Sequence, residues 1–438
     1  MKITFVSQYF FPDPFSNTQI VRELAGRGHD LRVVTGVPCY ATGSFAEGYS
    51  NSARRTEHWE GQAHREGQTH REDQTHQKDR THREGEIRVE RVRTLQRGRS
   101  TLKLMANYLG YALMAGIRLA RRAPRPDVIL VSQLSPVLMI WPAIVHRWRT
   151  GAPVVCWVQD LWPESATFPL GLKNPLITRP LSWLCGWLYR KPDLILVQSQ
   201  AFRPMIERFG VAPEKIRFFP NTAPADHVPR RPEEAPDEAA LVPQTGFRLM
   251  FAGNIGESQD FDTLIAAAER LRDRPELTWV IVGSGRDMDR VTARVAEKGL
   301  ADRFHFAGRH PMERMPYFFA HADAMLVSLK ATPIFALTVP YKVQGYMACA
   351  KPIVAALDGE GARIVREAGC GVTAPASDPD ALEGAIRTLL DTAPAARAAM
   401  GRAARAWFEA HYAADKIYGD LETWLAEAAS FESGRQLR

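Results

Sequence analysis

Cysteine is scarce in this chain of 438 residues, and the few cysteines present form no metal-binding or disulfide pattern. The five cysteines are odd in number and widely separated, without CxxC or CxxH spacing; they are residues 39, 156, 185, 349 and 370. This pattern excludes a disulfide framework and a structural zinc site of the usual spacing. Because unpaired thiols persist in reducing compartments, we expect a cytoplasmic protein.

Long apolar runs are also missing. Residues 104–117 form an apolar run of 14 residues, which as a helix would measure about 21 Å, less than the hydrocarbon core of about 30 Å. The run at 128–145 contains Ser132, Gln133, Ser135, Pro136 and Pro142 and predicts a strand followed by a helix. Residues 1–7 are too short an apolar run for a secretory signal and predict a first strand. The sequence therefore predicts no transmembrane segment.

Several chemical motifs are absent as well. There is no Walker A loop, and no GxGxxG follows the first expected strand of either half, so NAD-dependent chemistry and phosphoryl transfer lose support. No acidic DxD pair stands at a strand end, because Asp287-Met288-Asp289 falls in a helical pattern. We expect no metal site.

One tract is foreign to a globular pattern. From His64 to Ile87 a hexapeptide is repeated about four times, as HREGQT, HREDQT, HQKDRT and HREGEI. Such a tract cannot bury enough apolar surface to offset its ordering entropy, so we expect residues 60–86 or so to be a disordered insertion in one surface loop. Metal binding by its histidines is disfavoured, because histidines six residues apart share no helix face and lie about 20 Å apart in a strand.

Elsewhere strand-like and helical patterns alternate, which is typical of parallel sheets covered by helices. Expected strands begin at Ile3, Leu31, Val128, Val154 and Leu194, and in a second series at Arg248, Trp279, Phe304, Ala324 and Ile353. The Pro- and acid-rich stretch 223–246 separates the two series and has linker composition. The sequence predicts an α/β protein with two Rossmann-like, doubly wound parallel-sheet domains, residues 1–222 and 247–405, that face a cleft.

Positive charge is concentrated in one region. Residues 87–125 carry ten Arg and Lys against Glu90 alone, a net charge of +9 in a chain whose total is +7. The apolar run 104–117 lies inside this region, and six of the ten Trp lie between 141 and 187. A basic, Trp-rich apolar surface suits an anionic membrane face, and a buried helix surrounded by solvated arginines fits equally well.

Gly-rich turns follow three expected strands of the second half. They are Gly253-Asn254, Gly283-Ser284-Gly285 and Gly308-Arg309. Backbone amides at such turns, and the helix N-termini behind them, can hold an anion. One such turn often only reverses the chain, but three in one domain favour a nucleotide or phosphate site.

Longer segments carry a family resemblance. They are FAGNIGESQDFDTLIAAAERL (251–271), WVIVGSGRDMDRV (279–291), FHFAGRHPMERMPYFFAHADAMLVSL (304–329) and VPYKVQGYMACAKPIVAALDGEGARIVREAGCGV (339–372). This half resembles glycosyltransferase family 4, the retaining nucleotide-sugar enzymes of the GT-B fold. In the first half, GHDLRVVTGVPCY (28–40), WVQDLWPES (157–165) and IRFFPNTAP (216–224) are similar to a subgroup. That subgroup is the WbuB-like fucosamine and fucose transferases of O-antigen, colanic-acid and capsule assembly. The resemblance covers nearly the whole chain and implies a final helical segment, 406–432, that crosses back to the first domain.

The resemblance implies how a donor is held. A nucleotide diphosphate sugar would lie on the C-terminal domain, with the loop from Gly308 to Met315 at the base. The segment from Ile334 to Val339, which includes Thr338, would approach the sugar and phosphates. Lys342 would pair with the diphosphate, where a cation stabilises the charge that grows on the leaving group. An exposed lysine at a helix start is the simpler interpretation, but its place among the strand ends favours a functional role.

The chain departs from the family at four positions. Two glutamates that stand eight apart in many members correspond to Ala336 and Gln344, and Gln344 can still hydrogen-bond a ribose but carries no charge. The Arg and Lys that follow the first C-terminal strand in many members correspond to Asn254 and Gln259. Lys342 and Arg309 then remain the main candidate cations.

The first half supplies candidates for the acceptor side. Asp160 ends an expected buried strand and could orient or deprotonate an acceptor hydroxyl; capping the next helix is the alternative. Gln159, Trp162 and Glu164 flank it, and Glu164 is a second candidate carboxylate. Tyr9 ends the first strand, where lining the acceptor site and packing in an aromatic core are equally consistent.

We therefore expect retaining, metal-independent transfer of a hexose or deoxy-amino sugar from a UDP- or GDP-sugar to a lipid-linked saccharide. No cofactor beyond the sugar nucleotide and no nucleic-acid partner are expected, and the protein could bind peripherally to the cytoplasmic membrane face. No nucleophile is expected, since in the family's usual mechanism the departing diphosphate takes the acceptor proton. A nucleotide-sugar epimerase of similar fold and a non-catalytic GT-B scaffold are the alternatives.

Overall fold

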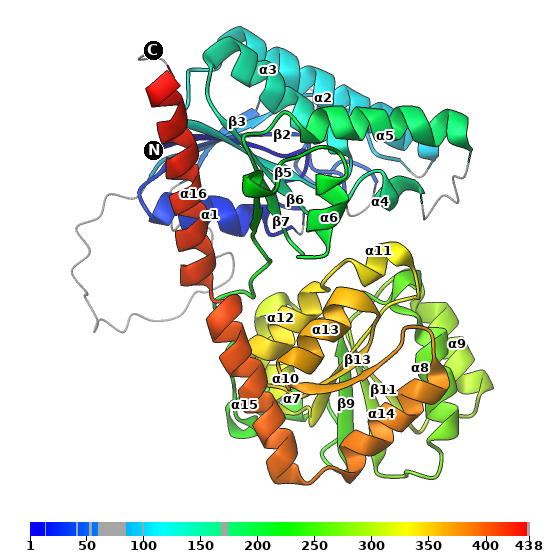
Figure 1. Ribbon diagram of the computed structural model, residues 1–438. Helices are drawn as coiled ribbons and strands as arrows, with labels where there is room; N and C mark the ends of the chain where they lie inside the picture. Colours follow the sequence, from blue (N-terminus) through cyan, green and yellow to red (C-terminus); the bar gives the residue numbers. More distant parts are fainter. Residues whose placement is uncertain are drawn as a thin grey trace. The chain divides into compact units, whose positions relative to one another are not determined.

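The chain forms two units in a computed structural model that describes residues 1–13, 15–40, 43–51, 55–59, 85–98, 100–167 and 174–435. Unit 1 comprises residues 1–198, 202–219 and 418–438, and unit 2 comprises residues 199–201 and 220–417 (Figure 1). The hexapeptide tract lies outside the described residues up to position 84. Each unit is built on one sheet, which confirms the predicted α/β class with two parallel-sheet domains.

The sheet of unit 1 has eight strands. In spatial order they are β3 (Arg55–Trp59), β4 (Ile87–Arg91), β2 (Asp30–Thr35), β1 (Lys2–Val6), β5 (Val128–Gln133), β6 (Val154–Val158), β7 (Leu194–Val197) and β8 (Ile216–Phe218). All neighbours are parallel except β3 and β4. The central strands β5 and β6 are buried along their whole length, as expected for parallel strands covered on both faces.

Helices cover both faces of this sheet. They are α1 (Asn17–Gly26), α2 (Thr101–Arg122), α3 (Trp141–Thr150), α4 (Glu164–Thr167), α5 (Pro175–Tyr189) and α6 (Phe202–Glu207), with short 3₁₀ turns η1 (Val137–Ile140) and η2 (Pro213–Lys215). Helices α2, α3 and α5 lie together on one face, and α1 lies on the other with the later part of α16 (Ala414–Arg435) (Figure 1). The Ser100 hydroxyl caps α2 by accepting a hydrogen bond from the Lys103 amide at 3.3 Å.

The hexapeptide tract connects two paired strands. Trp59, the last residue of β3, stands opposite Ile87, the first residue of β4, in an antiparallel ladder. The chain therefore leaves and re-enters the sheet at the same point. An insertion between these two residues does not interrupt any other strand of unit 1.

The sheet of unit 2 has six parallel strands. Their order is β11 (Phe304–Gly308), β10 (Leu277–Val282), β9 (Phe247–Ala252), β12 (Ala324–Ser328), β13 (Ile353–Ala356) and β14 (Gly371–Ala374). The core includes the stacked rings of Trp279 and Phe304, whose centroids are 5.5 Å apart. All ten strands expected from the sequence are present within two residues of their predicted starts.

The helices of unit 2 pack on both faces of the sheet, with α8 on α14 and α12 on α15. They are α7 (Pro236–Ala239), α8 (Phe261–Arg270), α9 (Met288–Glu297), α10 (Met315–Ala320), α11 (Pro333–Ala336), α12 (Tyr341–Ala348), α13 (Gly359–Glu367), α14 (Pro379–Asp391) and α15 (Pro394–His411), with 3₁₀ turns η3 (Pro232–Glu234), η4 (Glu257–Gln259) and η5 (Met312–Arg314). The stretch 223–246, expected to be a linker, is part of unit 2: it contains η3 and α7, and Glu238 pairs with Arg314 at 2.5 Å. Helix α16 begins in unit 2 and ends in unit 1.

Tyr346 of α12 joins two strands of unit 2 near their carboxyl ends. In the ladder between β9 and β12, the paired residues of β9 are Leu249 and Met250. Beyond this ladder the Tyr346 hydroxyl accepts a hydrogen bond from the Ala252 amide at 3.1 Å. The same hydroxyl lies 3.3 Å from the carbonyl oxygens of Ala252 and Leu326, to which it can donate. This buried phenol fixes α12 against the end of β9.

We predict that Tyr346→Phe lowers the free energy of unfolding by about 1–3 kcal/mol, because the buried Ala252 amide would lose its partner. Urea denaturation measures the change. Tyr317→Phe is the control, because the Tyr317 hydroxyl makes no hydrogen bond to any described residue. Equal stabilities of the two variants would contradict this role of Tyr346.

Candidate active site

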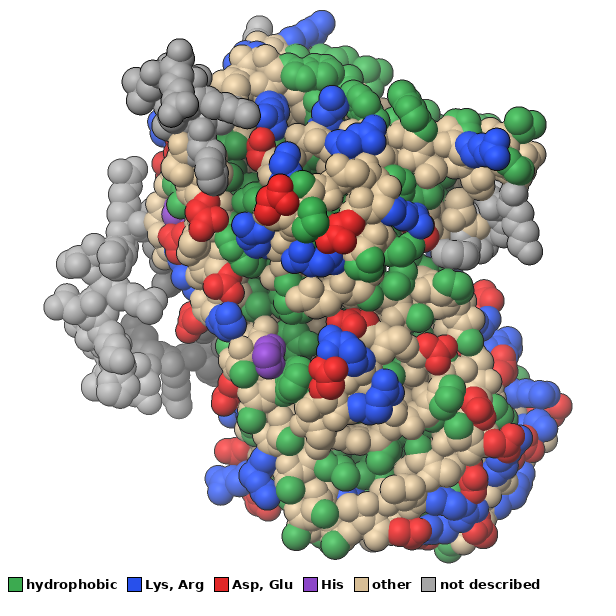
Figure 2. All heavy atoms as spheres, in the orientation of Figure 1, with side chains coloured by type: hydrophobic (Ala, Val, Ile, Leu, Met, Phe, Trp, Pro, Cys, Tyr) green, Lys and Arg blue, Asp and Glu red, His purple; other side chains and the backbone are tan. Residues whose placement is uncertain are grey.

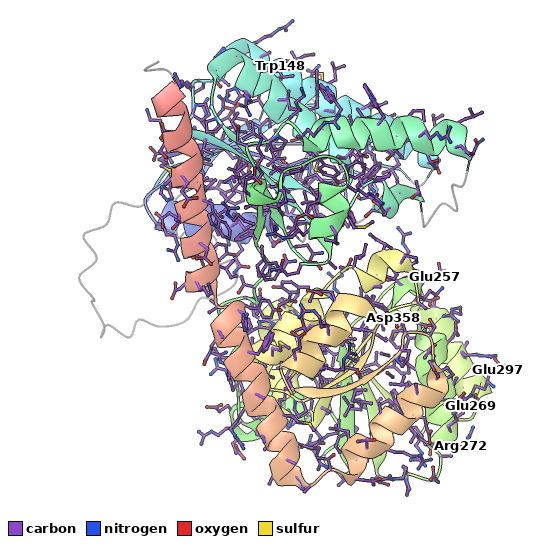
Figure 3. The ribbon with its side chains drawn as sticks, viewed as in Figure 1. Trp148, Glu257, Glu269, Arg272, Glu297 and Asp358 are labelled. Atoms are coloured by element: carbon purple, nitrogen blue, oxygen red, sulfur yellow. The ribbon has the colours of Figure 1, made fainter. Side chains whose placement is uncertain are left out.

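The three Gly-rich turns of unit 2 form one hydrogen-bonded framework beyond the strands. The Gly253 amide donates to the Val282 carbonyl at 2.9 Å, and the Gly283 amide donates to the Gly308 carbonyl at 2.7 Å. The Ile255 amide donates to the Ser284 carbonyl at 2.9 Å. The backbone bonding of β9, β10 and β11 thus continues past the carboxyl ends of the strands. Figure 3 labels Glu257 and Asp358 at this end of the sheet and Glu269, Arg272 and Glu297 toward the other.

Two of these turns require glycine. Gly253 has φ +141°, and a Cβ there would lie 2.6 Å from Cε of Lys342. Gly283 has φ +143°, and its Cβ would lie 1.9 Å from the Gly253 carbonyl oxygen. Both values fall where residues with side chains are strained. The absence of side chains at Gly253 and Gly283 lets the turns stack on each other and lets Lys342 lie across the first.

Lys342 lies in the first turn of α12, with its aliphatic chain over Gly253. Its Nζ donates to Oε1 of Gln259 at 2.7 Å and lies 4.9 Å from the centroid of the Phe251 ring. Among the described residues no carboxylate lies within ion-pair distance of it. Burial lowers the pKa of Lys342 to about 8. The structure thus holds a half-buried ammonium group with neutral neighbours and no counter-ion, which suits a bound anion.

Gln259 has a role that the sequence did not indicate. It occupies a position where the family resemblance implied a missing cation, yet in the structure its side-chain oxygen holds the ammonium group of Lys342. Its backbone carbonyl accepts a hydrogen bond from the Ser328 hydroxyl at 2.6 Å, which fixes η4 on β12. Gln259 and Lys342 are 83 positions apart, so no local sequence pattern could have paired them.

The other residues predicted to bind the sugar nucleotide differ in their exposure and in their hydrogen bonds. Arg309 and Asn254 are exposed, whereas Met315 and Val339 are buried and the Thr338 hydroxyl donates to the Ile334 carbonyl at 2.9 Å. Gln344 is fully buried, and with its side-chain amide turned so that the nitrogen faces the helix start, it donates to the carbonyl oxygens of Pro340 at 3.0 Å and Tyr341 at 3.2 Å. In this conformation Gln344 faces its own helix, so a ribose contact through it stays a prediction. Gly285 packs against the Ile255 carbonyl.

Arg286 was not among the sequence candidates. It follows Gly285 directly and is exposed, and it makes no ion pair with a described residue. Its only signal in the sequence is its place after a Gly-rich turn. Together with Arg309 it places two solvated guanidinium groups just beyond β10 and β11.

In unit 1, Asp160 follows β6 and is held by a side-chain network. Its Oδ2 accepts a hydrogen bond from the Ser135 hydroxyl at 2.7 Å, and that hydroxyl accepts one from Nε1 of Trp162 at 3.1 Å. Helix α4 begins only at Glu164, so Asp160 does not cap it. Burial raises the pKa of the Asp160 carboxyl, and the Ser135 hydrogen bond partly opposes that rise. Such a carboxylate is suited to accept a hydrogen bond or a proton from a hydroxyl.

The other residues predicted for the acceptor side are buried or already have partners within unit 1. The Gln159 amide nitrogen donates to the Ser132 hydroxyl at 2.7 Å, and Trp162 is buried. Glu164 is buried and paired with Arg208, which neutralises the second candidate carboxylate. Tyr9 is buried too, with its ring stacked on Phe15 at a centroid distance of 5.5 Å.

Comparison with protein families divides the chain at the same place as the fold. Residues 16–222 match the model described as "Glycosyl transferase 4-like domain", and residues 233–407 match "Glycosyl transferases group 1". A probable glycosyltransferase WbjE of Pseudomonas aeruginosa is 29% identical over 276 residues, which are 62% of this chain and 68% of that protein. A putative colanic acid biosynthesis glycosyl transferase, WcaI of Escherichia coli K12, is 27% identical over 322 residues, 71% of this chain and 72% of that protein.

Solved structures of similar fold cover nearly the entire chain. A sucrose-phosphate synthase from Thermosynechococcus elongatus superposes with a TM-score of 0.71 at 16% identity, covering 97% of this chain and 98% of its own. HepE of Anabaena with bound UDP-glucose gives a TM-score of 0.66 at 15% identity, covering 98% and 100%. WaaG, a glycosyltransferase of lipopolysaccharide biosynthesis, gives 0.61 at 15% identity, covering 98% and 99%.

The two family models together account for most of both units, and the two parallel-sheet domains are those of the GT-B fold. The chain belongs to the family 4-like glycosyltransferases of the GT-B fold.

Proposed function

We propose that this glycosyltransferase binds a nucleotide diphosphate sugar at the carboxyl end of the unit 2 sheet. The observation that carries the proposal is the Lys342 ammonium group, which lies against Gly253 without a counter-ion and beside backbone turns that can approach phosphates closely. A diphosphate there would replace solvent as the partner of this cation. Complexes of the structural neighbour HepE with UDP and with UDP-glucose support a nucleotide-sugar donor.

We further propose that transfer proceeds with retention and without a metal ion, to a lipid-linked saccharide acceptor that binds at unit 1. Asp160 would orient the acceptor hydroxyl, and the departing diphosphate, stabilised by Lys342, would take its proton. The name of WcaI, a putative colanic acid biosynthesis glycosyl transferase, supports a role in cell-envelope polysaccharide synthesis. We propose that the protein performs this role in the cytoplasm. A hexose or deoxy-amino sugar such as fucosamine would be the group transferred.

A panel of UDP- and GDP-sugars, incubated with and without a lipid-linked saccharide, tests the proposal. Release of nucleoside diphosphate that depends on the acceptor is the result we expect. Isomerised sugar without an acceptor would instead show an epimerase. No turnover with any donor would favour a binding scaffold.

Lys342→Met should weaken nucleoside diphosphate binding about 10- to 150-fold, because it removes a charge-assisted hydrogen bond that contributes about 1.5–3 kcal/mol to binding. Turnover should fall further, because the leaving diphosphate is more negative in the transition state than in the bound donor. Calorimetry and a transfer assay measure the two effects.

Asp160→Asn is the matched comparison for Lys342→Met, because it keeps the shape of the side chain and alters the acceptor side only. It should leave nucleotide affinity unchanged and reduce transfer. If Lys342→Met binds nucleotide and turns over like the wild type, the donor site is wrongly assigned and Arg309 becomes the residue to test.

A second observation favours attachment to an anionic membrane. Within the described residues no helix is long and apolar enough to cross a bilayer, but several large apolar side chains of unit 1 are exposed. On α2 they form one stripe at positions 102, 105, 109 and 113, and α3 and α5 add Trp148 and Trp183, which are 63% and 68% exposed. Figure 2 shows such apolar side chains interspersed with Lys and Arg along the edge formed by these helices, and Figure 3 shows Trp148 on the outer side of α3.

Basic residues lie at the other end of α2. A cavity of about 890 Å³ is lined by Arg88, Arg118 and Arg121 among other basic residues. The buried Glu90 pairs with three of the lining guanidinium groups, at 2.7 Å from Arg32, 3.3 Å from Arg88 and 2.9 Å from Arg118. Because one carboxylate neutralises only one of these three charges, the cavity keeps a net positive charge. Exposed apolar side chains and basic residues on the same helix are the two features through which a protein attaches to an anionic bilayer.

Leu102→Ser with Leu109→Ser should reduce co-sedimentation with anionic vesicles about tenfold or more, because each inserted leucine contributes about 1.5–3 kcal/mol when fully buried. Binding of the wild type should also weaken with salt, since charges are screened within about 8 Å at 0.15 M. Leu241→Ser, at an exposed leucine of unit 2, is the control. Equal sedimentation with neutral and anionic vesicles would remove the electrostatic part of the proposal.

A further inference from the structure

One guanidinium group in unit 1 is surrounded by aromatic rings. The Arg97 cluster consists of Tyr9, Phe15, Tyr40, Arg97 and Tyr108. Cζ of Arg97 lies 4.3 Å from the centroid of the Tyr40 ring and 5.8 Å from that of Tyr9, and its Nη1 is 3.5 Å from the Tyr9 hydroxyl. The rings of Tyr9, Phe15 and Tyr40 contact one another at centroid distances between 4.7 and 5.5 Å.

Arg97 has no counter-ion in the part of the chain that the structure describes. No carboxylate of the described residues lies within 4.0 Å of it, and Asp13, the carboxylate that acts on it from further away, already accepts a hydrogen bond from the Tyr40 amide at 3.0 Å. Arg91, a few residues earlier, shows the usual arrangement, with Glu57 at 2.9 Å. A half-buried guanidinium group with only phenols and rings around it has donors left for an anion.

The tyrosines can add donors to such a site. Burial raises the pKa of Tyr9 and of Tyr108, so both hydroxyl groups keep their protons at neutral pH. Tyr40 is 40% exposed, and an aromatic side chain at the surface offers an apolar area against which a sugar ring can pack. The cluster therefore combines anion donors with an apolar platform.

The Arg97 cluster shares its end of the sheet with Asp160. Tyr9 follows β1, Tyr40 follows β2, Arg97 follows β4 and Asp160 follows β6, all at carboxyl ends of parallel strands. Tyr108 connects them, because the charges of both Arg97 and Asp160 act on its hydroxyl. A ligand held by Arg97 would lie on the same end of the sheet as the Asp160 carboxylate.

We infer that the Arg97 cluster binds an anionic group of the acceptor, a phosphate or a carboxylate, with an acceptor sugar packed on Tyr40. The inference rests on the proposed function, because it assigns a charge to the acceptor that Asp160 orients. The anion has two possible sources, the diphosphate of a lipid carrier and the carboxylate of an acidic sugar. Bidentate guanidinium contacts suit either one.

Calorimetric titration with inorganic pyrophosphate and with glucuronate tests the inference in a Lys342→Met background, which removes the main cation of the donor site. Adding Arg97→Met should weaken binding of one or both probes about 10-fold or more, as expected for a lost charge-assisted contact. If only pyrophosphate binding depends on Arg97, the anion is a lipid diphosphate. If only glucuronate binding depends on Arg97, the anion belongs to an acidic sugar. Adding Arg402→Met, at an exposed arginine of α15, is the control.

Arg97→Lys keeps the charge and should restore part of the binding, which separates loss of charge from loss of packing; melting curves check that each variant folds. Equal affinity of the Arg97→Met and Arg402→Met proteins for both probes would overturn the inference. The readout needs no turnover, so a failure of the sugar-nucleotide panel would reject the proposed transfer reaction and leave this anion site standing.

Discussion

The structure of unit 2 depends on one close contact, the side chain of Lys342 across Gly253. Only a glycine at 253 leaves room for Cε of the lysine, and only a glycine at 283 leaves room for the Gly253 carbonyl beneath it. Gln259 then accepts a hydrogen bond from the ammonium group at 2.7 Å. These residues come from three separate parts of the chain. Together they keep a cation at the end of a sheet where none of the described carboxylates neutralises it. The cost of partly burying that charge is seen in its lowered pKa.

Unit 1 uses the same end of its sheet for a different chemistry. Parallel strands bring their carboxyl ends to one edge, so that the residues after β1, β2, β4 and β6 lie at one end of the sheet although they are spread from position 9 to position 160. Asp160 with Ser135 and Arg97 with its tyrosines are the result. In the proposed reaction, unit 2 stabilises a leaving anion and unit 1 orients a nucleophilic hydroxyl, and both tasks depend on groups held without an ion-pair partner.

Much of the fold could be predicted, because buried parallel strands are nearly continuous apolar runs. The strands that escaped prediction have weaker patterns: β3 reads RTEHW, β4 alternates apolar and charged residues, and β8 and β14 are short. At the site, the Gly-rich turns, Lys342, Asp160 and Glu164 were visible in the sequence. Their partners were not, since Gln259 and Ser135 reach their contacts through the fold, and the ion pair of Glu164 with Arg208 joins residues 44 positions apart.

The central claim is that Lys342 is a cation without a counter-ion until a diphosphate binds. NMR titration of protein labelled at the lysine ε-position, with the Lys342 signal assigned by its loss in Lys342→Met, measures this directly. Because burial disfavours the charged form and a bound anion favours it, we expect a pKa of about 8 in the free protein and a higher value after nucleoside diphosphate is added. An ordinary lysine pKa of about 10.4 in the free protein, unchanged by nucleotide, would contradict the account.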